Sequence, residues 1–167
     1  MYAGYHVDVK AEGLLTNYLR KLKNMNVVTN VGIINGATYA DGTSVAYVGY
    51  LNEYGGHNPE RPFLKRTMEK RYKAWTKLIY VTLKSEGLSG ASVQKAFDRA
   101  GIMAVGDVKK TIKGWSPTDP RPNKPATIRA KERRGRNGKN LQAIDPNVVL
   151  IDTGIMIRSI THEVRHI

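Results

Sequence analysis

Residues 62–84, PFLKRTMEKRYKAWTKLIYVTLK, carry the pattern of a long helix. Pro62 suits the first helical turn, because the N–H that proline lacks would have no partner there. Apolar side chains then recur at three- and four-residue steps, which gathers them on one helix face. This buried stripe is predicted to contain Leu64, Met68, Tyr72, Trp75, Ile79 and Leu83. Outside the stripe the segment carries Lys65, Arg66, Lys70, Arg71, Lys73 and Lys77, whose alkyl stems can lie along apolar surface. The segment therefore predicts a long amphipathic helix.

Two other segments have helical spacing. Gly87 and Gly90 separate the first helix from a second one, predicted over residues 91–113. Its apolar positions are Val93, Phe97, Ala100, Ala104, Val108 and Ile112. A shorter amphipathic helix is predicted over residues 10–25. Its apolar positions are Leu14, Leu15, Tyr18, Leu19 and Leu22.

The predicted strands lie on both sides of these helices. Residues 27–35 and 44–54 are rich in β-branched or aromatic side chains. Gly36, Asp41 and Gly42 lie between them and suit a hairpin connection, so we expect an antiparallel pair. Near the end of the chain, residues 148–151 predict a short strand. A turn at 152–154, one helical turn and a final strand from Ser159 follow.

Residues 115–148 differ in composition from the rest, being rich in proline and basic residues and showing no helical or strand period. We expect an extended basic loop or arm, of a length that is uncommon unless it is disordered or carries function. Such an arm can bind phosphates through counterion release, or it can be a solvated loop. The candidate residues for DNA or an acidic partner are Arg121, Lys124, Arg129, Lys131, Arg133, Arg134, Arg136 and Lys139.

The composition fits one soluble domain over residues 1–167. There are 27 Lys and Arg against 14 Asp and Glu, giving a formal net charge of +13. The absence of cysteine excludes disulfide scaffolds, Cys-based zinc sites and thiol catalysis. No run approaches the roughly 18 apolar residues of a membrane span, and the first residues lack a secretory signal. The charge predicts an anionic partner, which can be nucleic acid, an acidic protein face or anionic lipid.

The enzyme motifs are weak. Residues 162–166, HEVRH, match the zinc-protease pattern H-E-x-x-H, but the surrounding alternation favours a strand, in which the two histidines would lie about 13 Å apart. Motifs for phosphate-binding loops, dinucleotide binding and nucleophilic serine are absent. Asp41, Glu53 and Asp152 could serve a metal-dependent nuclease, although their spacing does not require it. We therefore predict no catalytic residue, metal or cofactor, and we expect Tyr54 and Trp115 to be packing anchors.

Three segments, in this order, resemble the small neck and tail-completion proteins of long-tailed bacteriophages. They are AYVGYLNEYGG with PERPFL (46–64), WSP with PATI (115–128), and LIDTG with IM and IRSIT (150–161). The matching residues of the first block are Glu53, Gly55, Pro59, Arg61, Pro62, Phe63 and Leu64. Those of the last block are Leu150, Ile151, Asp152, Thr153, Gly154, Ser159 and Ile160. Val149 stands where the family often has proline, and the arm is more basic than the family pattern.

The resemblance implies an α+β subunit with a small antiparallel sheet packed against a long amphipathic helix. It implies head-to-tail joining without catalysis, by a ring of usually six copies around the DNA channel between the portal complex and the tail tube. The partners would be copies of the chain, neighbouring neck, connector or tail proteins, and packaged DNA through non-specific contact, with no membrane. The location would be the virion, and the host cytoplasm during assembly. A tail terminator that caps the tube, and a basic nucleic-acid-binding protein, remain alternatives.

Overall fold

The computed structural model describes residue 20 and residues 27–34, 36–56, 58–115, 121–136 and 145–166. Within these ranges the chain forms β1 (Val27–Ile33), α2 (Val45–Tyr54), α3 (Phe63–Glu86), α4 (Gly90–Lys113), α5 (Pro125–Arg136), α6 (Ile155–Arg158) and β2 (Ile160–His166). The helix expected over residues 10–25 lies outside the described residues, except for Arg20.

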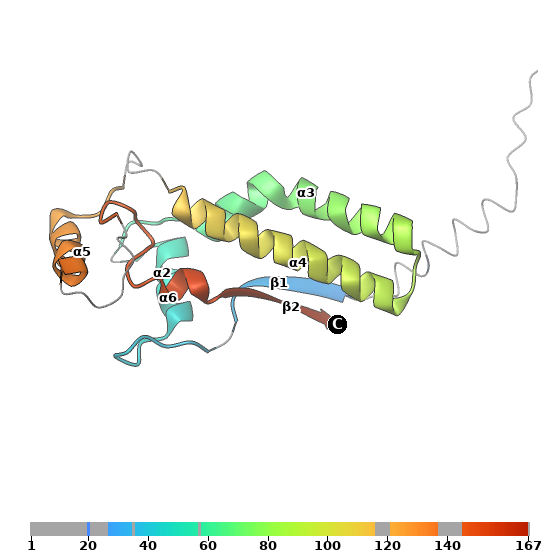
Figure 1. The fold of residues 1–167 in the computed structure, drawn as a ribbon, viewed down its shortest axis with the longest axis horizontal. Helices are drawn as coiled ribbons and strands as arrows, with labels where there is room; N and C mark the ends of the chain where they lie inside the picture. Colours follow the sequence, from blue (N-terminus) through green and yellow to red (C-terminus); the bar gives the residue numbers. More distant parts are fainter. Residues whose placement is uncertain are drawn as a thin grey trace, which may run out of the picture.

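The elements form an α+β fold in three layers (Figure 1). α4 is the middle layer, because it packs against α3 on one side and against both strands on the other. β1 and β2 pair antiparallel, from Val27 opposite His166 to Ile33 opposite Ile160. α2, α5 and α6 lie together at one end of this stack. No helix in the described ranges has an apolar stretch long enough to cross a membrane.

The strand predicted over residues 44–54 is wrong, because this segment is the helix α2. The Ser44 hydroxyl accepts a hydrogen bond from the Tyr47 amide (3.4 Å) and caps the helix. Val45, Gly49 and Glu53 are its buried residues, and their four-residue spacing belongs to a helix. The predicted hairpin therefore does not form, and β1 pairs instead with the strand at the other end of the chain, which was predicted correctly.

The two long helices are confirmed, but the buried stripe of α3 is narrower than predicted. α4 buries Val93, Ala100, Ala104, Val108 and Ile112 as expected. In α3, Met68 and Tyr72 are 54% and 50% exposed. α3 is the outer layer and its main packing partner is α4, so part of its apolar stripe remains at the surface.

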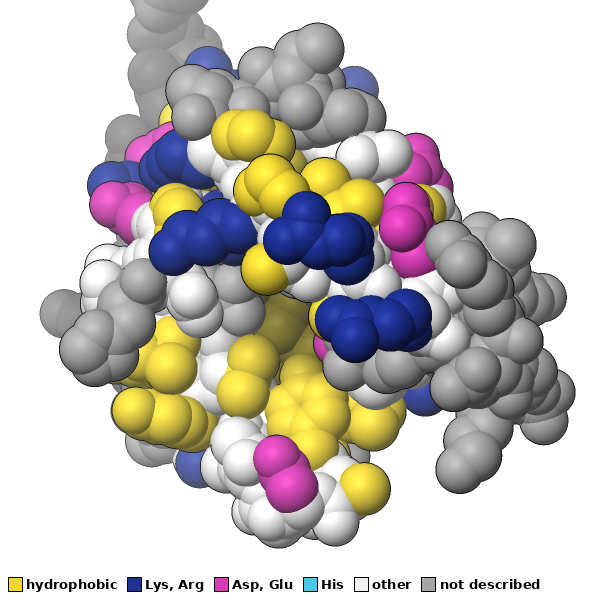
Figure 2. Space-filling model, turned by 90° about the vertical axis from the view of Figure 1, so that its left-hand side faces the viewer, with side chains coloured by type: hydrophobic (Ala, Val, Ile, Leu, Met, Phe, Trp, Pro, Cys, Tyr) yellow, Lys and Arg dark blue, Asp and Glu magenta, His cyan; other side chains and the backbone are white. Residues whose placement is uncertain are grey.

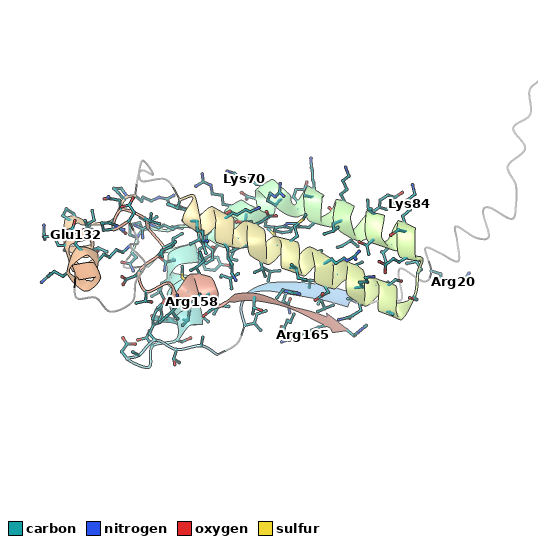
Figure 3. The ribbon with its side chains drawn as sticks, viewed as in Figure 1. Arg20, Lys70, Lys84, Glu132, Arg158 and Arg165 are labelled. Carbon is teal, nitrogen blue, oxygen red and sulfur yellow. The ribbon has the colours of Figure 1, made fainter. Side chains whose placement is uncertain are left out.

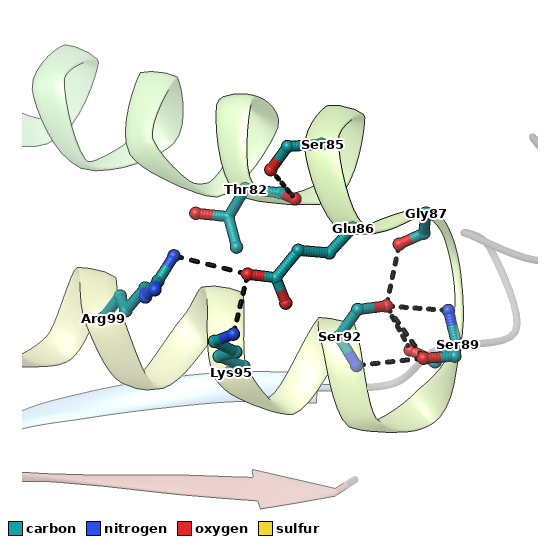
Figure 4. Close-up of polar contacts among 8 residues, drawn as sticks. All are labelled: Thr82, Ser85, Glu86, Gly87, Ser89, Ser92, Lys95 and Arg99. Atoms are coloured by element: carbon teal, nitrogen blue, oxygen red, sulfur yellow. Dashed lines mark hydrogen bonds and ion pairs between the residues drawn. The ribbon is translucent and has the colours of Figure 1, made fainter.

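The turn between α3 and α4 is closed by polar contacts (Figure 4). Ser89 and Ser92 form a capping box, in which each side chain accepts a hydrogen bond from the other residue's amide. The Glu86 carboxylate pairs with Lys95 (2.8 Å) and lies 3.5 Å from Arg99. These contacts join the end of α3 to the first turns of α4.

The C-terminal expectations are mostly confirmed. Residues 152–154 form bends, one helical turn follows as α6, and β2 begins at Ile160. The strand expected at 148–151 is wrong, because residues 149 and 150 form a turn. The expectation of an irregular loop over residues 115–148 is also wrong for residues 125–136, which form α5. Pro125 suits the helix start, and most of the residues that follow favour a helix.

A close approach of α4 to the sheet requires Gly101. A Cβ atom at this position would overlap the ring of His162 and lie 2.9 Å from the Cγ2 atom of Thr29. Gly106, on the same helix, has no atom within 4 Å of the equivalent position.

We expect Gly101→Ala to lower the free energy of unfolding by about 1–3 kcal/mol, because the added methyl group forces α4 away from β2. Gly106→Ala is the matched control and should raise it by up to about 1 kcal/mol, since alanine favours helices. Urea unfolding followed by circular dichroism measures both. Equal effects of the two substitutions would contradict this packing.

Candidate functional site

The first and last of the three sequence blocks of the resemblance, residues 53–64 and 150–160, are called the first and second block from here on, and parts of both lie at the end of the molecule formed by α2, α5 and α6. A cleft of about 350 Å³ lies there, and segments from four parts of the chain line it. The lining includes Asn52, Pro59, Arg61, Asn123, Lys131, Leu150, Ile151, Asp152, Thr153, Gly154 and Met156. Figure 2 shows this end, with Lys and Arg side chains gathered over a hollow that has hydrophobic side chains on its walls. The blocks are thus neighbours in space although about ninety residues separate them.

Glu53 connects α2 to the start of α3. Its carboxylate accepts hydrogen bonds from the amides of Leu64 (2.9 Å) and Lys65 (2.8 Å). These are first-turn amides of α3, which have no partner within the helix, and the helix dipole favours a negative charge there. Glu53 is only 5% exposed, so its charge acts with little solvent screening.

The loop between the two helices holds this arrangement in place. Gly55 ends α2 with a φ of 82°, in the left-handed region that favours glycine. The Arg61 amide donates to the Asn52 carbonyl (2.6 Å), and Phe63 is completely buried in the main core. The E-x-G…R-P-F-L block is therefore a helix–loop–helix connection fixed by one carboxylate and one aromatic anchor.

Arg61 also connects the first block to the segment before α5. Its guanidinium donates to the carbonyl of Arg121 (2.9 Å) and lies 3.4 Å from that of Pro122. Arg61 is 8% exposed. Five donors in a planar fork allow one arginine to hold several carbonyl oxygens, so this residue has a structural role here.

The second block forms the opposite wall of the cleft. Leu150 has a φ of 67° and Gly154 a φ of 74°, so the backbone turns sharply on both sides of residues 151–153. The Thr153 carbonyl accepts from the Arg158 guanidinium (3.1 Å). Ile160 is buried in the core at the start of β2. As the sequence predicted, Asp152, Thr153 and Gly154 form a turn.

The basic residues predicted to meet an anionic partner divide into two groups. Lys131 points inward: its Nζ atom donates to the carbonyls of Val148 (2.7 Å) and Ile151 (2.6 Å). Lys124, Arg129 and Arg133 are exposed. Arg121 is half-buried, Arg134 and Arg136 lie in the last turn of α5, and Lys139 lies outside the described residues. The expected free arm is thus a helix attached to the domain through Lys131.

Two structural contacts in this site were not predicted from the sequence. The Asn123 amide donates to the carbonyls of Pro146 (3.0 Å) and Val148 (3.3 Å). Together with Lys131, it holds α5 against the second block.

Burial raises the pKa of the Tyr39 phenol in the cleft wall, and the nearby carboxylates of Asp152 and Asp41 raise it further. Tyr39 therefore remains a neutral hydrogen-bonding group at physiological pH.

The described residues contain no group of three or more His, Asp or Glu side chains placed to hold a metal ion. His162, Glu163 and His166 lie on β2, so the H-E-x-x-H residues do not have the helical spacing that zinc needs. His162 instead contacts the Asp98 carboxylate of α4 (2.8 Å).

The two aromatic residues that were expected to be packing anchors differ in burial. Trp115 is buried as expected, and the Arg66 guanidinium lies over its ring. Tyr54 is 69% exposed, so its prediction as a packing anchor is wrong.

Comparison of the chain with protein-family models, with curated proteins and with solved structures gives no significant match. The functional argument therefore rests on the sequence blocks and on the geometry of the site.

We expect Glu53→Gln to lower the free energy of unfolding by about 1–3 kcal/mol, because an amide loses the charge and one of the two acceptor oxygens. Glu60→Gln is the control, since Glu60 is exposed in the same loop. Urea unfolding at neutral pH compares the two variants with the unchanged chain. An effect of Glu53→Gln as small as that of Glu60→Gln would show that the carboxylate does not hold α3.

Proposed function

We propose that this chain is a structural subunit of the neck of a long-tailed bacteriophage, acting in tail completion or head-to-tail joining. In this role it forms a ring with its copies around the DNA channel, between the portal complex and the tail tube. The observation that carries the proposal is that Pro59 and Arg61 of the first block line one cleft together with residues 150–154 of the last block. Phe63 of the first block and Ile160 of the last also lie in the same buried core, so residues that resemble one family in sequence order lie close together in space.

The architecture supports assembly with other protein chains. Among the described strands, β1 pairs only with β2, so the sheet has two outer edges. Outer edges can extend from one subunit to the next by strand addition. The cleft and the exposed cations of α5 offer a second surface at the other end of the layers.

The charge also supports a partner of opposite sign. Each copy carries +13, and a closed ring places these charges close together, where they repel. Acidic neighbouring rings or packaged DNA would neutralise this charge. Lys124, Arg129 and Arg133 are exposed on or beside α5 and are suited to such a contact.

A phage that carries a stop codon in this gene tests the proposal. We expect electron micrographs of the lysate to show DNA-filled heads beside unattached tails of normal length, because the joining ring is missing. A plasmid-borne copy of the gene should restore complete particles. Overlong tails would assign the terminator role instead, and infectious virions in normal yield would contradict both roles.

The second candidate function, nucleic-acid binding, is favoured by a separate observation on α3. Arg66, Lys70, Lys73, Lys77 and Lys84 are exposed and fall on one side of the helix. Figure 3 shows Lys70 and Lys84 pointing away from α4. The four lysines have no ion pair with other described residues. The stripe is about 27 Å long, which is long enough to follow several backbone phosphates.

Under this candidate, we expect replacement of Lys70, Lys73 and Lys77 by Gln to weaken binding of a labelled DNA duplex. The slope of log K against log salt should also become shallower by roughly 3, because three phosphate contacts are lost. The matched control replaces the exposed cations Lys124, Arg129 and Arg133 by Gln, which removes the same charge. Equal losses in both variants, measured by fluorescence anisotropy between 50 and 200 mM salt (about a fourfold range), would contradict a specific role of α3.

A further inference from the structure

Two depressions flank the two-stranded sheet, one beside each outer edge. The β1-side groove, of about 720 Å³, lies between β1, α3 and α4 and is lined in part by Thr29 and Val31. The β2-side pocket, of about 520 Å³, is lined by residues 159–162 at the start of β2 and by Ile102 and Lys109 of α4. Among the described strands, neither outer edge is covered by a further strand. Each edge is therefore a row of open backbone groups beside a depression.

Both depressions leave large apolar side chains open to water. Met68 and Tyr72 of α3 are 54% and 50% exposed in the β1-side groove. Ile102 of α4 is 58% exposed at the β2-side pocket. Exposed apolar patches of this kind mark interaction surfaces. The two patches lie beside opposite edges of one sheet, so a contact between them joins two copies of the chain.

The two depressions also carry opposite charges. Glu69 lines the β1-side groove, and Lys109 lines the β2-side pocket. Neither side chain has an ion pair with another described residue. A contact between the two depressions would therefore bring together a free carboxylate and a free ammonium group.

The contacts between α3 and α4 show that these two charges lie at the same height. The two contacts are Thr67 with Thr111 (2.7 Å) and Arg71 with Asp107 (3.0 Å). Glu69 and Lys109 lie midway between them, each on its own helix. Both helices and both strands run along one common direction (Figure 1).

We propose that the β1 edge of one copy pairs antiparallel with the β2 edge of the next copy in a ring. The β1-side groove then faces the β2-side pocket of the next copy. Glu69 pairs with Lys109 of that copy, and Ile102 of that copy joins the apolar surface around Tyr72. This inference rests on the proposed ring and names the surfaces that build it.

Ring symmetry fixes the register of this pairing. Opposite residues of an antiparallel pair exchange either two backbone hydrogen bonds or none. Where they exchange none, their N–H and C=O groups point to the two outer edges at the same height. Copies in a ring are related by rotation alone, so these groups stay level when the strands run along the ring axis. The pairing between copies therefore repeats the register within the chain, with Val28 opposite Arg165 of the next copy.

The charges favour this head-to-tail contact over a symmetric one. Pairing of two β1 edges would bring two Glu69 side chains to the same contact, and pairing of two β2 edges would bring two Lys109 side chains together. Like charges repel, whereas pairing of unlike edges brings opposite charges together. Unlike surfaces are also what a closed ring requires.

Single engineered cysteines test the contact, because the chain has no cysteine of its own. A Val28→Cys chain is mixed with an Arg165→Cys chain and mildly oxidised, in moderate salt that screens the repulsion between copies. We expect the mixed disulfide dimer to be the main cross-linked product. The matched control mixes Val28→Cys with Thr161→Cys, which lies about 13 Å further along β2 and should give no mixed dimer. Intact mass distinguishes the products.

Three disulfide results would overturn the proposal. Val28→Cys homodimers as the main product would show pairing of two β1 edges, and Arg165→Cys homodimers would show pairing of two β2 edges. Equal mixed dimer in the test and control mixtures, or none in either, would show that β1 and β2 of different copies do not pair in this register.

Charge reversal gives a second measurement without cysteine. We expect Glu69→Lys to weaken self-association roughly threefold to tenfold in sedimentation velocity, because it places two cations at the contact. Adding Lys109→Glu to the same chain should restore association. Glu60→Lys is the control, since it makes the same charge change at an exposed residue outside both depressions. A double variant that stays as weak as Glu69→Lys would overturn the proposed pair.

The stop-codon phage separates this contact from the proposed function. Unattached heads and tails, together with no mixed disulfide, would support the neck role and overturn this contact. A mixed disulfide together with infectious virions in normal yield would support the contact and contradict the neck role.

Discussion

The close packing of α4 against the two strands is the constraint on which the rest of the structure depends. A two-stranded sheet is marginal in water without a packing partner, and α4 is its main partner. The contact is tight because the facing helix residues are small, with Gly101 beside the His162 ring. Hydrogen bonds from Thr29 to the Phe97 carbonyl (3.1 Å) and between His162 and Asp98 (2.8 Å) fix each strand to the helix.

This constraint also builds the candidate site. β1 and β2 come from opposite ends of the described chain, and their pairing brings the segments beside them together. α2 follows β1 and α6 precedes β2, so both reach the same end of the layers. Glu53 then fixes the start of α3, and Arg61 and Lys131 hold backbone carbonyls around the cleft. Arg61 and Lys131 therefore have structural contacts with backbone carbonyls. Fewer cations are available to bind an anion than the net charge of the chain suggests.

The sequence predicts the elements whose side-chain period is unambiguous. α3, α4, β1 and β2 all follow from periodicity, and so does the turn at 152–154. α2 was missed because its aromatic and β-branched residues favour a strand, and only the Ser44 cap and the burial of Glu53 select the helix. α5 was missed because the prolines around it masked a proline-free run after Pro125.

Partners that are distant in sequence could not be predicted in the same way. Local turn residues favoured pairing of β1 with the next segment, whereas its partner lies more than 120 residues away. The block residues of the site were found through resemblance, but the inward roles of Asn123 and Lys131 depend on carbonyls that only the fold places near them. Periodicity gave the apolar stripe of α3 but not which part of it another element covers.

The sheet edges restrict how copies of this chain can assemble. Among the described strands, β1 and β2 each have one outer edge that no strand covers. Pairing of two identical edges is symmetric and closes a dimer, whereas a ring needs two different complementary surfaces. The proposed ring would therefore join the β1 edge of one copy to the β2 edge of the next, or use the α2, α5 and α6 end for one of its contacts.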